Sequence, residues 1–397
     1  MAVATIGSVA TDNTDFVLPV ASNDLYTSAI KTDELKYFKQ KGIINFEGRL
    51  SQVGDAGLVV NLRNLFRQDG LPLRGDIDPY ENTKDPVYGN RSIQLYKLSR
   101  PFAFTKKNSI SQQATLIDLQ KGHEASHMSY MTDVVLKGIF SQAGLNNGTS
   151  IDCEAISVTG VTNSDERLSL TGNNAVNFSA TDFATYKRYH VAGGASDAQS
   201  LGSSNILTTK ELMKACKNIA SDTAYVEPFA QLGGGTLGAA VIAQSDLYNL
   251  MNEQATTGTA WTFSKAYEYA AQAGTIQKIG MMQVINVIGI PLDIIVFPDT
   301  YFHKATHSST GAPVASTRRL FILGKNAVDA VLGQAVAGKD FMPFSVEVDT
   351  SYKKMGTKGF GQVSGVFGFK NTQFNLKSGG STLVPLSTYI IDVHVGA

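Results

Sequence analysis

The longest periodic stretch of the sequence runs from Ser111 to Ala143 and reads SQQATLIDLQKGHEASHMSYMTDVVLKGIFSQA. Larger apolar residues recur along it at roughly helical spacing, which predicts an α-helix. They are Leu116, Leu119, Tyr130, Met131, Val134, Leu136 and Ile139. Ser111 can cap the start, and Gly144 can end the helix. A helix of about 33 residues would be about 50 Å long, longer than most globular helices. We therefore expect a spine helix with one face on a sheet.

Two apolar stretches upstream of this helix predict a long β excursion. Leu58–Leu62 leads outward, and Ile93–Leu98 returns with an alternation of period two. The segment between them is rich in Gly, Pro and Asp, too long for a tight hairpin and too polar for a core. Connections of this length are uncommon inside compact domains and are usually functional or disordered. We expect an extended hairpin within residues 46–105.

The first 45 residues have little to bury on their own. They begin with an irregular polar stretch, Thr11–Asp15, and a short helix is expected over Thr32–Lys41, capped by Thr32. Two interpretations stay open at this point. The segment is either a frayed terminus or an arm that docks on a neighbouring subunit.

The second half of the sequence predicts an alternation of helices and strands. Residues 150–205 are rich in Ser, Thr, Asn, Gly and Ala, which indicates a loop-rich insertion with a few short strands. Beyond it we expect helices at Thr209–Ala220, Ser245–Glu253 and Lys325–Leu332, with strands at Ala239–Ala243 and Ile290–Phe297. The last stretch, Phe344–Val395, returns to β-type patterns at Ser345–Val348, Gly365–Phe369 and Tyr389–Val395.

The composition favours a chain whose surface is not all left to water. Only 17% of the 397 residues are charged, against roughly 25% in a typical soluble protein, and interface cores are depleted of charge. The 34 basic residues equal the 34 acidic ones, so any contact with DNA should be weak and non-specific. Two cysteines, Cys153 and Cys216, are too few for a disulfide framework or a metal cluster. No signal peptide or membrane span is evident, and we expect a soluble protein made in the cytoplasm.

One motif suggests zinc chemistry. His123-Glu124-Ala125-Ser126-His127 matches the H-E-x-x-H pattern, which places two imidazoles on one helix face with a Glu beside a bound water. A third protein ligand is missing, because the nearest downstream acid, Glu154, lies in a polar loop. The preferred interpretation is a polar stripe where the helix meets a neighbouring element. We therefore expect no catalytic, cofactor-binding or metal-binding residues.

A second motif resembles a dinucleotide fingerprint. Gly233-Gly234-Gly235-Thr236-Leu237-Gly238 matches G-x-G-x-x-G, but Pro228 interrupts its approach and a predicted strand follows it. The fingerprint needs a strand before it and a helix N-terminus after it to receive phosphate. We expect a flexible loop here, and a solvated hairpin at the basic run Lys353–Lys358.

Three stretches resemble the HK97-like major capsid proteins of tailed bacteriophages. Gly238–Leu250 is similar to a strand-then-helix step of their apical domain, and Arg319–Ala327 is similar to a second strand and helix near the capsomer axis. The most specific stretch is Gly365–Asn375, which resembles the end of the capsid family of N4-like short-tailed phages. The resemblance is sharper from Leu207 to Asn375 than over Phe46–Leu145, and residues 150–205 lack it.

The resemblance implies an α+β, HK97-like major capsid fold. The order along the chain would be an N-terminal arm (1–45), an extended β-hairpin or E-loop with the start of a peripheral domain (46–105), the peripheral domain with its spine helix (106–149), a loop-rich insertion (150–205), an α/β axial domain (206–340) and return strands of the peripheral domain (341–397).

The function implied is self-assembly into hexamers and pentamers that form an icosahedral shell around phage double-stranded DNA. Expected partners are further copies of the chain, a portal protein, a scaffolding protein, decoration proteins and, non-specifically, the packaged DNA, with no membrane and no cofactor. The location would be the virion capsid, assembled in the host bacterial cytoplasm. Two alternatives stay open: an encapsulin-like nanocompartment shell, and a zinc metallopeptidase built on His123, Glu124 and His127.

Overall fold

The structure is a computed structural model of the 397-residue chain. It describes residues 34–47, 59–65, 88–105, 116–144, 180–185, 187–221, 235–253, 263–307, 313–332, 344–353, 358–375 and 383–396. Structural statements below refer to these residues. The predicted arm before residue 34, the tip of the excursion, Ser111 and Cys153 lie outside them.

The described strands form two main sheets and two small ones. A five-stranded sheet contains β1 (Ile44–Glu47), β4 (Tyr96–Thr105), β11 (Val328–Leu332), β12 (Phe344–Lys353) and β13 (Lys358–Asn371). A seven-stranded sheet has the order β5 (Tyr189–Val191), β16 (Thr388–His394), β10 (Thr317–Leu323), β6 (Gly238–Ala243), β9 (Leu292–Phe297), β8 (Met282–Asn286) and β7 (Ile276–Ile279). Two-stranded ladders join β2 (Val59–Leu65) to β3 (Tyr88–Gln94) and β14 (Gln373–Asn375) to β15 (Leu383–Pro385).

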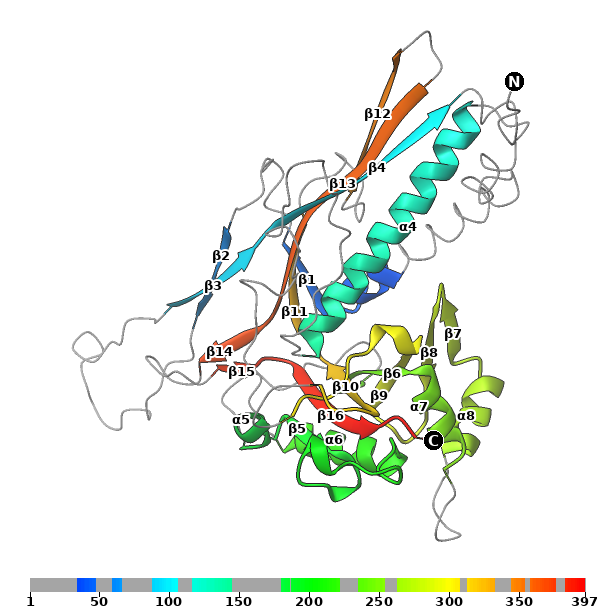
Figure 1. The fold of residues 1–397 in the computed structure, drawn as a ribbon. Coiled ribbons are helices and arrows are strands. Elements are labelled where there is room, and N and C mark those ends of the chain that lie inside the picture. The colour runs from blue at the N-terminus through cyan, green and yellow to red at the C-terminus, as the bar shows by residue number, and fades with distance from the viewer. Residues whose placement is uncertain are drawn as a thin grey trace, which may run out of the picture.

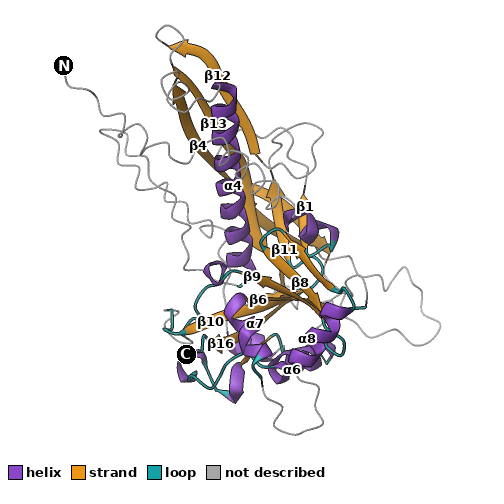
Figure 2. Cartoon of the chain, turned by 90° about the vertical axis from the view of Figure 1, so that its right-hand side faces the viewer, coloured by secondary structure: helices purple, strands orange, loops and turns teal. Residues whose placement is uncertain are grey.

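The helices divide between the two sheets. A long helix, α4 (Leu116–Ala143), runs beside β4 and β13, whereas the shorter helices gather around the seven-stranded sheet (Figures 1 and 2). The shorter ones are α5 (Ala180–Thr185), α6 (Thr209–Ala220), α7 (Gln244–Met251) and α8 (Phe263–Gln272). Single 3-10 turns occur at Ala192–Gly194, Ala198–Ser200 and Asp299–Tyr301.

The predicted spine helix is confirmed as α4. It spans 28 residues. The helix lies along β13 and β4 and points away from the seven-stranded sheet (Figure 1). Val135, Leu136, Ile139 and Phe140 are fully buried, whereas Tyr130 is 41% exposed. From Val134 to Gly144 every position except Lys137 is buried, so this end of the helix is enclosed by the core, whereas Tyr130, which the spacing placed on the apolar face, is exposed.

The predicted strand-then-helix step at Gly238–Leu250 is also confirmed. β6 pairs in parallel with β9 and in antiparallel with β10, so it is buried in the middle of the seven-stranded sheet. α7 follows at once from Gln244. The predicted helix at Thr209–Ala220 is α6, with the side chain of Thr208 accepting the Glu211 N–H at its start.

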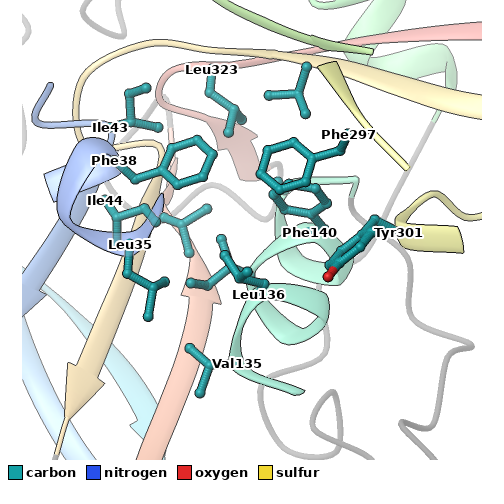
Figure 3. Packing of buried hydrophobic residues seen from close by; sticks show 14 of the residues in the cluster. Leu35, Phe38, Ile43, Ile44, Val135, Leu136, Phe140, Phe297, Tyr301 and Leu323 are labelled. Atoms are coloured by element: carbon teal, nitrogen blue, oxygen red, sulfur yellow. The ribbon is translucent and has the colours of Figure 1, made fainter. Parts of the chain in front are cut away.

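A single apolar cluster joins the two sheets. Phe140 of α4 contacts the rings of Phe38, Phe297, Tyr301 and Phe321. Figure 3 shows Phe38, Phe140 and Phe297 pointing toward one another from the N-terminal helical turns, α4 and the seven-stranded sheet, with Tyr301 beside Phe140. Edge-to-face aromatic contacts of this kind add about 0.5–1.5 kcal/mol each beyond the burial of area. The cluster is therefore the main apolar connection between the sheets.

The predicted helix at Lys325–Leu332 is wrong. Val328–Leu332 is β11, which pairs in parallel with β1 and in antiparallel with β13. Asn326 has a φ of 56°, in the left-handed region, which a right-handed helix does not accommodate. The likeness of Arg319–Ala327 to a strand and helix thus holds only for its strand, β10. Consecutive residues of β11 are buried on both faces of the sheet, which removes the alternation that would have revealed the strand.

Three strands pair outside the domain in which the sequence analysis placed them. β11 falls within 206–340 yet belongs to the five-stranded sheet, and β16 falls within 341–397 yet lies between β10 and β5. β5 comes from the expected insertion, 150–205, and forms the parallel edge beside β16. The chain passes between the sheets more often than a linear division predicts, because sheet membership depends on pairing partners far away in sequence.

The end of the predicted arm belongs to the subunit itself. Residues 34–40 are helical, and Leu35, Phe38, Ile43 and Ile44 are all no more than 2% exposed. These apolar residues pack in the cluster that joins the sheets. The arm interpretation therefore applies only to the residues before Glu34, which lie outside the described part.

The predicted excursion is partly confirmed. β2 and β3 pair in antiparallel from Val59–Gln94 to Leu65–Tyr88, as an extended hairpin requires. Its return continues into β4, whose entire length pairs with β13. Ile93 and Leu95 are 0% and 1% exposed. The base of the excursion is thus part of the subunit's own core.

Candidate functional site

The histidine motif lies on α4. His127 is half-buried, and its ring meets that of Phe102 of β4 edge-on, with centroids 5.1 Å apart. This contact agrees with the expected stripe where the helix meets a neighbouring element. The side chains of His123 and Glu124 are outside the described part. Among the described residues, no group of three or more His, Cys, Asp or Glu side chains is arranged to hold a metal ion.

The glycine-rich motif leads into a strand. Gly238 opens β6, and the Leu237 N–H donates to the Pro291 carbonyl at 2.8 Å, so the end of the motif already follows the edge of β9. Gly233 and Gly234 lie outside the described residues. The predicted order, with a strand directly after the motif, is confirmed and differs from that of a dinucleotide fingerprint.

A buried ion pair joins β10 and β16, which are the third and second strands from the β5 edge of the seven-stranded sheet. Arg319 of β10 lies opposite Asp392 of β16, with Nε–Oδ1 and Nη2–Oδ2 distances of 2.8 and 3.0 Å. The Tyr189 hydroxyl of β5 donates to the same carboxylate at 3.0 Å. Burial, followed by the Asp392 charge, raises the pKa of Tyr189. This bidentate pair joins three neighbouring strands through side chains.

A second cluster joins the sheet to α7. Arg318 donates to Asp246, the acidic residue in the first turn of α7, at 2.8 Å and to Asp299 at 3.1 Å. Burial raises the pKa of Asp246 to about 6, although the Arg318 charge opposes the rise. Burial also acts to raise the pKa of Asp299, but hydrogen bonds from Ser245 and the Arg318 charge leave it below its ordinary value.

A third cluster fastens α6 to the edge of the sheet. His190 Nδ1 lies 2.8 Å from the Tyr389 hydroxyl, and its Nε2 lies 2.8 Å from a carboxylate oxygen of Glu211. Burial lowers the pKa of His190, and the acceptor Glu211 only partly offsets this. Burial would raise the pKa of Glu211, but His190 and the Gly193 N–H together lower it. The order Glu, His and Tyr resembles a proton-relay chain.

These three clusters serve the packing of the subunit. Their central residues, Arg319, Asp392, Asp246, His190 and Glu211, are all less than 9% exposed, so a substrate would have no access to them. Each cluster links elements that are distant in sequence, up to 203 residues apart for Tyr189 and Asp392. Sequence reasoning missed all three, because isolated Arg, Asp and His residues carry no local spacing signal.

The surfaces available to a partner are of a different kind. Among the described strands, β2 and β3 pair only with each other, and an isolated two-stranded ladder is marginal in water. Large apolar side chains are also exposed on the helices and turns around the seven-stranded sheet. They are Met213, Tyr248, Tyr269, Met281 and Ile288. Single exposed apolar residues are common on protein surfaces, so the β2–β3 ladder is the feature that favours a protein partner.

The fold defined by a helix-backed long sheet, an extended hairpin and an α/β unit is the HK97-like fold of phage capsid proteins. The capsid of Ralstonia phage GP4 has a TM-score of 0.62 and 14% identity, covering 90% of this chain and 88% of that one. The cyanophage Pam1 capsid asymmetric unit has a TM-score of 0.56 and 12% identity, covering 90% of both chains. The head structure of Helicobacter pylori bacteriophage KHP40 has a TM-score of 0.52 and 11% identity, covering 89% and 88%.

The likeness is one of structure. No family model matches the sequence, and no curated protein matches it. At identities of 11–14% the shared property is the fold, and the role of the chain is argued separately.

Proposed function

We propose that the chain is the major capsid protein of a tailed bacteriophage. Copies would associate into hexamers and pentamers, and these would close into an icosahedral shell around double-stranded DNA. The observation that supports this proposal most strongly is the HK97-like fold. The structural match covers about nine tenths of this chain and of each of the two capsid chains.

The shape of the subunit supports this proposal. α4 and the strands β4, β12 and β13 project together from the α/β unit, giving an elongated molecule (Figures 1 and 2). An elongated chain leaves more of its surface outside its own core than a sphere of the same mass. Contacts with neighbouring copies would cover that surface, and obligate interfaces commonly bury about 2,000–5,000 Å².

The proposed partners follow from this role. They are other copies of the chain, a portal protein, a scaffolding protein, decoration proteins and the packaged DNA. The balanced charge, 34 basic against 34 acidic residues, supports a weak, non-specific contact with DNA. The proposed location is the virion capsid, with assembly in the host cytoplasm, and the proposed chemistry is neither enzymatic nor cofactor-dependent. No described helix is long and apolar enough to cross a bilayer.

Electron microscopy of the expressed full-length chain tests the proposal. We expect closed shells, or free hexameric and pentameric capsomers, at micromolar concentration. Particles from infected cells should contain double-stranded DNA, whereas an enzyme cargo would indicate a nanocompartment instead. A chain that remains monomeric over a wide concentration range, with and without a scaffolding protein, would contradict the proposal.

A further inference from the structure

Residues 34–47, here called the junction segment, connect the two main sheets. On the five-stranded side, β1 adds a parallel ladder to β11, from Ile44–Val328 to Glu47–Val331. The ladder is extended by the carbonyl of Ile43, which accepts the Ala327 N–H at 2.9 Å. These bonds form a continuous backbone attachment to the five-stranded sheet.

A buried side-chain bond reinforces the same attachment. Asn45 donates to Asp329 of β11 at 3.1 Å, and Thr372, just after β13, donates to the other carboxylate oxygen at 2.9 Å. Asp329 is 2% exposed. Because both oxygens of a buried carboxylate are occupied, separating β1 from β11 would leave unsatisfied polar groups and a high cost.

The attachment to the seven-stranded sheet is made by side chains alone. Glu34 accepts the backbone N–H of Met281, in the turn between β7 and β8, at 2.7 Å. Lys41 lies 3.3 Å from Asp293 of β9, and its side chain is 27% exposed. Phe38 stacks on Phe297 of β9, with centroids 6.2 Å apart and planes inclined by 14°. No backbone ladder joins the described junction segment to this sheet.

We propose that the junction segment is a latch that sets the relative orientation of the two sheets. It opens at its side-chain contacts with the seven-stranded sheet and remains attached through β1 to the five-stranded sheet. The difference follows from the bonds: the five-stranded side adds a cooperative backbone ladder, whereas the described contacts with the seven-stranded side are an ion pair, one capped amide and the packing of Leu35, Phe38 and Ile43 in the shared apolar cluster. The role of the latch in a shell rests on the proposed function.

Hydrogen exchange of the full-length subunit, read by mass spectrometry, tests the latch. The variant Lys41→Met keeps the length of the side chain and leaves Asp293 without its ammonium group. We expect exchange to rise about tenfold over residues 34–41 and 276–286, because the buried Asp293 carboxylate loses its charged partner. Exchange over 44–47 and 328–332 should stay within about twofold of the original protein. Lys36→Met, at an exposed position in the helix before Lys41, is the matched control and should change neither region.

Two results would overturn the latch. If exchange rises equally in all four regions, the junction segment opens as one unit. If exchange stays unchanged in all four, the Lys41–Asp293 contact does not hold the segment on the seven-stranded sheet. A second variant, Glu34→Ala, guards against a folding defect of the first; it removes the acceptor of the Met281 N–H and should increase exchange over the turn that contains Met281. Because these measurements use the unassembled subunit, they are independent of shell formation. A chain that shows the expected exchange pattern but forms no shells would refute the proposed function and leave the latch standing.

Discussion

The ring of Phe102 lies across Gly361 on the neighbouring strand, and the two residues are direct partners in the β4–β13 ladder. A Cβ atom placed on Gly361 would come within 2.4 Å of the Phe102 ring. The same ring meets His127 of α4. The absence of a side chain at Gly361 therefore lets one aromatic residue connect the strand pair to the spine helix.

The substitution Gly361→Ala should lower the stability of the subunit. The added methyl forces the Phe102 ring to move, and overpacking of this kind typically costs about 1–3 kcal/mol. Thermal unfolding monitored by circular dichroism would measure the loss. Adding Phe102→Leu to the Ala variant should recover part of it, and a double variant less stable than the sum of the singles would contradict the steric explanation.

Breaking the central ion pair should have a larger effect. Arg319→Met leaves Asp392 buried without its guanidinium partner, so the free energy of unfolding should fall by about 3–5 kcal/mol. Chemical denaturation gives this value. Lys214→Met is the control, because Lys214 reaches Glu211 only at 3.8 Å with a side chain that is 42% exposed. That change should lower the free energy of unfolding by less than about 1 kcal/mol. If both variants lost a similar free energy of unfolding, the buried pair would not be the stronger interaction.

His303 should make the subunit less stable in mild acid. Burial, followed by the Arg319 charge, lowers the pKa of His303 from 6.5 to about 4. Between these values the unfolded chain binds the proton and the folded chain does not, so stability falls as the pH drops below about 6.5. The loss from this residue should reach about 2 kcal/mol at pH 5. The variant His303→Gln should show a flatter dependence of melting temperature on pH between 7 and 5, and an unchanged slope would contradict the assignment.

Shortening the excursion should separate folding from assembly. The ladder of β2 and β3 ends with the pair Leu65–Tyr88, so replacing residues 66–87 with a short Gly-Ser turn keeps the described strands. We expect a folded subunit with a cooperative melt that no longer forms closed shells. Electron microscopy and calorimetry would be read together. Normal shells from the shortened chain would show that the replaced residues are dispensable, and a chain that fails to fold would place them in the core.

The histidine motif should bind no zinc. The variant His123→Gln should leave the zinc content of the purified protein, its melting temperature and its assembly unchanged within error. Elemental analysis of the unmodified chain is the direct measurement, with zinc expected well below one equivalent. A tightly bound zinc ion whose removal abolishes a proteolytic activity would overturn the proposed function as a whole.

Elements with a strong local pattern were predictable from the sequence. α6 was expected at Thr209–Ala220 and has those bounds, because its capping Thr208 and its periodic apolar face are both local signals. The opposite case is β11, where Val328, Ala330 and Val331 are all fully buried and show no alternation. Which sheet a strand joins depends on partners hundreds of residues away, so β5, β11 and β16 could not be assigned.

The polar clusters were beyond the reach of sequence reasoning for a related reason. Arg318 and Arg319 are adjacent in sequence, yet one points to Asp246 and Asp299 and the other to Asp392. Their alternation on β10 sends them to opposite faces of the sheet. Only the pairing register determines which acid each arginine meets.

The position of β13 near the end of the chain has a consequence for synthesis. β13 holds β4, β11 and β12 together, and Thr105 reaches its partner only when Lys358 has been made. During synthesis, β4 and α4 therefore lack β13, the strand on which both pack, until most of the polypeptide has emerged from the ribosome. At about 5–20 residues per second this delay is of the order of ten seconds or more. During that interval the nascent spine exposes apolar residues, which makes the growing chain a substrate for the chaperones of the cell that produces it.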